Sequence, residues 1–112
     1  MAEIIFAVPI IPGKQELDRS TLDELTEARR DEYESALREA GITRHAVWHE
    51  DTPEGTIALV YMQADDADAP MRFTNSEGAI NKFFVQRMQD VHGIDISQTP
   101  PPPVSKVHDV EI

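Results

Sequence analysis

The 112-residue sequence contains no cysteine. This absence excludes disulfide bonds, thiolate catalysis and zinc sites built on cysteine. The sequence also lacks any apolar run near the roughly 20 residues that a membrane crossing requires. Its beginning, "MAEIIFAVPI", has an acidic residue at position 3 and no basic region before the apolar run, so it predicts a first strand and not a signal peptide. Together these absences predict a cytoplasmic protein.

Basic residues are few as well. Ten Lys and Arg stand against 21 Asp and Glu, which gives a formal net charge of -11. Proteins bind nucleic acids and anionic membranes through cations placed near the phosphates, so we expect neither partner here. A glycine-rich phosphate loop, a serine nucleophile elbow and a dinucleotide fingerprint are also absent, and we therefore expect no cofactor.

Hydrophobic periodicity predicts the order strand, helix, strand, strand, helix, strand. A first strand is predicted over residues 3–8, and helical spacing of apolar residues follows over 15–40 and 76–92. Ser20 or Thr21 could cap a second segment, so the first helix would then start late or break near them. Gly41 and Gly93 stand where a left-handed residue commonly ends a helix. We assign residues 1–96 to the folded domain, and residues 97–112 to a proline-rich spacer followed by a C-terminal strand or arm.

The only tryptophan and two of the four histidines lie in one predicted hairpin, Ile42–Ala64. Its "TPEG" segment has proline at the first central position of a turn and a closing glycine. A two-residue loop there would place Trp48 opposite Leu59 and Ala46 opposite Tyr61. A longer loop would shift the register by one residue and exchange the two faces.

The third predicted strand is apolar on both faces. One face carries Ile57, Leu59 and Tyr61, and the other carries Ala58, Val60 and Met62. An antiparallel sheet with helices on one side normally leaves its other face to water. We therefore predict a ferredoxin-like α+β domain, a βαββαβ antiparallel sheet with two helices on one face, that forms a homodimer in which two sheets meet as a barrel.

Several sequence segments carry a family resemblance. They are "PGK" after the first strand, "ARRDEYESALREAGI", "VWHEDTPEGTIALVYMQA", and "HGIDIS" before the proline-rich tail. With them the chain resembles the dimeric α/β-barrel superfamily, most of all a family of small uncharacterised bacterial proteins. It is more distantly similar to antibiotic-biosynthesis monooxygenases and small polyketide cyclases. The resemblance implies the fold and a pocket for a flat hydrophobic ligand, whereas no catalytic motif of those enzymes matches here.

Four residues are candidates for binding a ligand. Trp48 and Tyr61 would share one sheet face, where an indole and a phenol suit a planar aromatic molecule. The alternative is that both only pack in the core. Arg29 and Tyr33 lie on the otherwise apolar stripe of the first predicted helix. Arg29 would extend to the rim, pair with an acid such as Glu50, or bind an anionic group of the ligand.

Three histidines are candidates for moving a proton, because the pKa of histidine suits general acid–base work. His45 and His49 would share one side of the second strand, and His92 ends the second helix, where the helix dipole also favours it. His45 and His49 would ligate a metal only with a third ligand such as His92 or His108. No dense cluster of histidines and carboxylates accompanies them, so we expect no metal.

These observations lead to two main hypotheses. The first is a homodimeric barrel that binds a small hydrophobic or aromatic molecule and performs no chemistry. The alternative is a cofactor-independent monooxygenase or a polyketide-cyclase-like enzyme, which needs a histidine in the cavity within about 3 Å of a substrate proton. A third hypothesis, haem binding, needs an axial ligand directed into the pocket.

Overall fold

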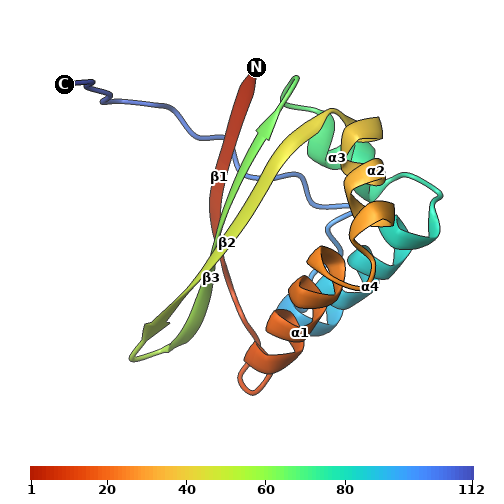
Figure 1. The fold of residues 1–112 in the computed structure, drawn as a ribbon. Coiled ribbons are helices and arrows are strands. Elements are labelled where there is room, and N and C mark those ends of the chain that lie inside the picture. The colour runs from red at the N-terminus through yellow and green to blue at the C-terminus, as the bar shows by residue number, and fades with distance from the viewer.

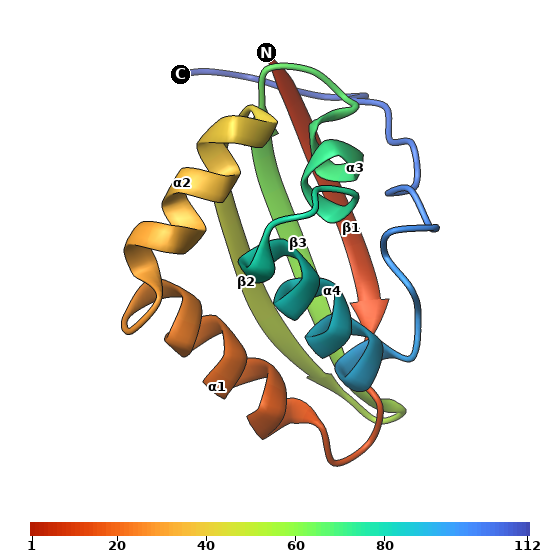
Figure 2. The ribbon, with the colours of Figure 1, turned by 90° about the vertical axis from the view of Figure 1, so that its right-hand side faces the viewer.

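The computed structural model describes all 112 residues and contains a three-stranded antiparallel sheet covered by helices on one face (Figure 1). The strands are β1 (Ala2–Pro9), β2 (Ile42–Thr52) and β3 (Gly55–Ala64), in the order β1-β3-β2. The helices are α1 (Gln15–Thr26), α2 (Arg30–Ala40), α3 (Ala69–Thr74) and α4 (Ala79–His92). All four lie on the same side of the sheet (Figure 2). The predicted α+β class is confirmed.

The helical segment predicted over residues 15–40 consists of two helices, α1 and α2, that meet at residues 27–29 and not near Ser20 or Thr21. Neither glycine nor proline occurs at this break, so tertiary contacts determine it. Arg29 stands at the start of α2, where its guanidinium lies 4.6 Å from the centre of the Phe83 ring and 3.0 Å from Glu32. The break therefore turns the charged end of Arg29 onto an aromatic face of α4.

The predicted C-terminal strand does not form within this chain, which corrects the four-stranded expectation. Residues 93–112 contain neither helix nor strand. The run Pro100–Pro103 has no backbone N–H to donate, and the chain passes β1 to reach the side of the sheet away from the helices (Figure 1). The exposed end of the chain touches the domain where Lys106 lies 3.2 Å from Glu3. The segment with the alternating pattern therefore pairs with no strand of this chain.

The predicted register of the hairpin is confirmed. A two-residue loop joins β2 to β3, Trp48 faces Leu59, and Ala46 faces Tyr61. Since side chains alternate along a strand, His45 and His49 lie on the face that the helices cover. Trp48 and Tyr61 lie on the opposite face.

The core fills the layer between the sheet and the helices. Every strand and every helix contributes residues to it, among them Ile4, Leu25, Tyr33, Val60, Met62, Phe73, Phe84 and Met88. Gly41 and Gly93 end α2 and α4 with φ of 87° and 75°, as predicted for left-handed residues. None of the four helices has the length and apolar character that a membrane crossing requires.

Candidate functional site

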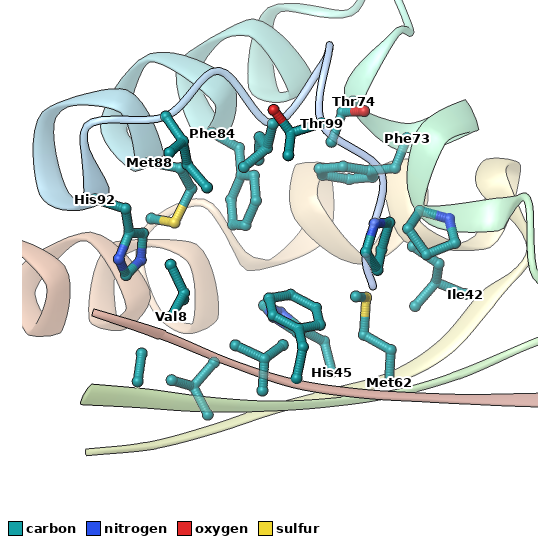
Figure 3. A pocket seen from close by; sticks show the side chains of 18 of the residues that line it. Val8, Ile42, His45, Met62, Phe73, Thr74, Phe84, Met88, His92 and Thr99 are labelled. Atoms are coloured by element: carbon teal, nitrogen blue, oxygen red, sulfur yellow. The ribbon is translucent and has the colours of Figure 1, made fainter. Parts of the chain in front are cut away.

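A cavity of about 200 Å³ lies between the helix-facing side of the sheet and the helices (Figure 3). All three strands and all four helices contribute to its wall, and so does the segment 94–102 that follows α4. Seventeen of its 26 lining residues are hydrophobic, so most of its surface suits an apolar ligand. An engineered cavity of about 150 Å³ is large enough to bind benzene, so this one has room for roughly one substituted aromatic ring.

Tyr33 from α2 and His45 from β2 form a hydrogen-bonded pair on the cavity wall. The Tyr33 hydroxyl oxygen and His45 Nδ1 are 2.5 Å apart. Burial lowers the pKa of His45 to about 4, although the charge of Asp18 acts in the opposite direction. Burial also raises the pKa of the Tyr33 hydroxyl. Both side chains are therefore neutral at neutral pH. The Tyr33 O–H has no other acceptor within the chain, and on this ground we assign it as the donor and His45 Nδ1 as the acceptor.

Two phenylalanines hold this pair in place. The Phe84 ring stacks on Tyr33 with 6.4 Å between centroids, and the Phe73 ring meets Tyr33 edge-on at 6.2 Å. Phe84 also meets the His45 ring edge-on, at 6.0 Å. Figure 3 shows Phe73, Phe84 and His45 on the cavity wall. The pair is thus fixed from α2, α3, α4 and β2 at once, with aromatic surfaces next to its polar atoms.

A second polar pair joins α1 to β2. Asp18 is only 2% exposed, and its Oδ2 lies 2.7 Å from His49 Nε2. The carboxylate accepts, so Nε2 carries a proton, while the buried His49 Nδ1 has no partner within the chain. Asp18 lines the cavity and His49 does not. Only Oδ2 takes part in this bond, so Asp18 Oδ1 remains as an acceptor.

His92 lines the cavity at the end of α4 (Figure 3). Its Nδ1 lies 2.8 Å from the carbonyl oxygen of Pro9 at the end of β1. A carbonyl only accepts, so Nδ1 carries the proton and Nε2 of the neutral ring is an acceptor. This bond joins the C-terminus of α4 to the sheet and fixes the orientation of the ring.

The other predicted ligand-binding residues lie away from this cavity. Trp48 is 56% exposed on the far face of the sheet, and the Tyr61 O–H on that face donates to Glu3 at 2.6 Å. Arg29 pairs with Glu24 and Glu32 instead of the Glu50 that we considered. Of the seven predicted site residues, the cavity brings together Tyr33, His45 and His92.

Sequence reasoning missed several residues of the cavity wall. Asp18 looked like one more acid on an acidic helix, yet it is aligned with Leu22 and Leu25 at helical spacing, and this alignment marks an inward carboxylate. The prolines 100–102 were interpreted as a spacer, and they also line the cavity. Nowhere in the structure do three His, Asp or Glu side chains gather closely enough to hold a metal ion.

The fold is that of a small ferredoxin-like α+β protein, as predicted. The crystal structure of L-rhamnose mutarotase FA22100 from Formosa agariphila is similar to it, with a TM-score of 0.67 over 99% of this chain and 100% of that chain. The two sequences are 15% identical, so this likeness concerns the fold. No protein-family model matches the sequence, and no curated protein matches it.

Proposed function

We propose that this protein binds a small hydrophobic or aromatic molecule in its interior cavity. One observation carries the proposal: an apolar cavity of about 200 Å³ has a fixed hydrogen-bonding pair, Tyr33 and His45, on its wall. Apolar volume with a few convergent polar groups is the usual composition of a small-molecule site.

Binding is favoured over catalysis because of the protonation of this pair. A general acid or base works best when its pKa is near the working pH. The pKa of His45 is lowered to about 4 and that of Tyr33 is raised, so neither exchanges a proton readily at neutral pH. The alternative, a cofactor-independent monooxygenase or polyketide-cyclase-like enzyme, therefore rests on His92, whose Nε2 is free to accept a proton.

The similar crystal structure raises the question of a sugar ligand, since that protein is named an L-rhamnose mutarotase. A monosaccharide carries several hydroxyl groups, each of which needs a partner when it is buried. The polar or titratable side chains of this cavity wall are Asp18, Tyr33, His45, Thr74, His92 and Thr99. The other lining side chains are apolar, so the cavity suits an apolar ring better than a sugar.

Thermal unfolding in the presence of toluene, naphthalene and L-rhamnose tests this proposal, because binding to the native state raises the apparent stability. We expect toluene or naphthalene to raise the melting temperature and L-rhamnose to leave it unchanged. Val47→Phe fills the cavity from β2 and should abolish the effect, while Ile57→Phe on the far sheet face should retain it. Stabilisation by L-rhamnose alone, or by none of the three, would contradict the proposal.

We also propose that a second copy of the chain covers the far face of the sheet. This face carries an apolar band whose exposed members are Ile5 at 51%, Trp48 at 56% and Leu59 at 37%. The register places Leu59 beside Trp48, and Tyr61 beside Ile5, so the band is continuous across the three strands. An apolar patch of this kind on a sheet is typical of a subunit interface.

The charges around this band fit a two-fold partner. Exposed Arg44 and Glu50 stand on β2 on the same face, at opposite ends of the band. A two-fold axis that crosses the strands places Arg44 of one copy opposite Glu50 of the other, and the band opposite itself. Sedimentation at micromolar concentration should give a dimer for the natural chain and for Trp48→Phe, and a monomer for Trp48→Glu. A natural chain that stays monomeric would contradict this arrangement.

A further inference from the structure

We infer that the ligand of the cavity is not an anion and carries a hydroxyl group that donates a hydrogen bond to the oxygen of Tyr33. The inference rests on the proposed binding function and names the chemical class of the ligand. Three features of the cavity wall carry it: the absence of lysine and arginine, the carboxylate of Asp18, and the remaining acceptor of the Tyr33–His45 pair.

An anionic ligand would find no suitable counter-ion. Neither lysine nor arginine lines the cavity. Two arginine side chains of the helix layer, Arg29 and Arg87, lie over the Phe83 ring at 4.6 and 5.0 Å from its centre. His45 is neutral. The hydrogen bond of His92 to Pro9 is exposed to solvent, where an ion pair between His92 and a ligand anion would contribute little. A carboxylate that enters this cavity would therefore lose its hydration without compensation.

The one carboxylate on the cavity wall adds to this difficulty. Asp18 lines the cavity, and its Oδ2 accepts from His49 Nε2 at 2.7 Å, so only one of its two oxygens is bonded within the chain. The negative charge of Asp18 repels an anion that enters the same cavity. The cavity thus disfavours an anionic ligand.

The Tyr33–His45 pair presents a fixed acceptor to the ligand. The Tyr33 hydroxyl donates its single hydrogen bond to His45 Nδ1, so its oxygen can accept a further hydrogen bond. Donation to an imidazole also strengthens the acceptor, since hydrogen bonds in a chain polarise one another. An alcohol or phenol supplies the missing donor, whereas an ether or a hydrocarbon of the same shape does not.

Four small aromatics of matched shape test the inference by isothermal titration calorimetry at neutral pH. They are toluene, p-cresol, 4-methylanisole and 4-methylbenzoate. We expect p-cresol to bind about three- to tenfold more tightly than toluene, which corresponds to one net hydrogen bond. We expect 4-methylanisole to bind no more tightly than toluene, and 4-methylbenzoate to bind at least about tenfold more weakly than toluene.

Two variants of the pair, with a third variant as a control, assign the effect. Tyr33→Phe should reduce the affinity for p-cresol to that for toluene and leave toluene binding unchanged. Tyr61→Phe removes a tyrosine hydroxyl on the far sheet face and should change none of the four affinities. His45→Gln keeps an acceptor for the Tyr33 hydroxyl, so it should retain the preference for p-cresol even if Tyr33→Phe does not fold.

The outcomes separate the two proposals. Failure of all four compounds to bind would contradict the binding function itself. Binding of toluene with an equal or greater affinity for 4-methylbenzoate would overturn the exclusion of anions and leave the binding function intact. Equal affinities for toluene and p-cresol in the natural chain would overturn the role of the Tyr33 oxygen.

Discussion

The hydroxyl of Tyr33 lies 2.5 Å from Nδ1 of His45 and joins α2 to β2 on the wall of the cavity. Both groups are polar in a place where most neighbours are apolar, so each satisfies the hydrogen-bonding need of the other. The bond also determines that the Tyr33 oxygen meets a ligand as an acceptor. Stability, pH dependence and ligand preference are thus linked through one contact.

Tyr33→Phe should lower the free energy of unfolding by about 1–3 kcal/mol, because it leaves a buried imidazole nitrogen without a partner. Urea denaturation at neutral pH measures this change. Adding His45→Phe removes the orphaned nitrogen, so the double variant should lose less than the sum of the two single variants. Strict additivity would show that the two side chains do not act as a pair.

The stability of the protein should fall as the pH is lowered through the titration range of His45. Its pKa is about 4 in the folded protein, against an ordinary value of 6.5, so the unfolded chain binds the proton more strongly. The contribution is therefore complete above the unfolded value and is lost as the pH falls from 6.5 towards about 4, to a total of about 3 kcal/mol.

Urea denaturation of the natural chain and of His45→Gln across this range measures the effect. Glutamine keeps an acceptor for the Tyr33 hydroxyl and does not titrate, so the variant should lose clearly less stability on acidification. An identical dependence on pH in both proteins would show that His45 does not titrate at a lowered pKa. The ring proton shifts of His45 in an NMR titration give the same pKa directly.

The sequence predicted the parts of this fold that depend on local chemistry. The hairpin register followed from the turn residues in "TPEG" and from the alternation of β3, and both helix ends followed from Gly41 and Gly93. The break between α1 and α2 carries no such signal, because contacts of Arg29 with α4 stabilise it. The alternation of 104–112 is typical of a strand, yet this segment passes the edge strand β1 without pairing with it.

The candidate site could be predicted only in part, for a physical reason. Tyr33 and His45 were each recognised, but their contact depends on how α2 lies across β2, which no local pattern encodes. Trp48 was chosen as a rare aromatic residue, and the face it occupies is exposed in the isolated chain. Asp18 was missed because a buried carboxylate looks like a surface acid until its partner His49 is placed opposite it.

Asp18→Ala should lower the free energy of unfolding by about 1.5–3 kcal/mol, because hydrogen bonds that involve a charged group contribute about that much. The substitution also leaves both ring nitrogens of His49 without a partner inside the protein. Asp23→Ala removes a carboxylate from the exposed face of the same helix, and should change stability by less than about 0.5 kcal/mol. Equal effects of the two substitutions in urea denaturation would contradict a structural role for the Asp18–His49 pair.

Shortening the C-terminal segment should open the cavity. Residues Pro100–Pro102 form part of its wall and have no N–H to donate. The polar contacts that tie this stretch to the domain are the hydrogen bond from Asn75 to the Ser97 carbonyl and the Lys106–Glu3 ion pair. Truncation after Thr99 should increase the dissociation rate of p-cresol and weaken its binding, as measured by NMR line shapes. Truncation after Val104 keeps the prolines and removes only exposed residues and the Lys106 contact, so it should leave both quantities nearly unchanged. If the two truncated proteins bind p-cresol alike, the prolines do not close the cavity, and a ligand must enter between the helices instead.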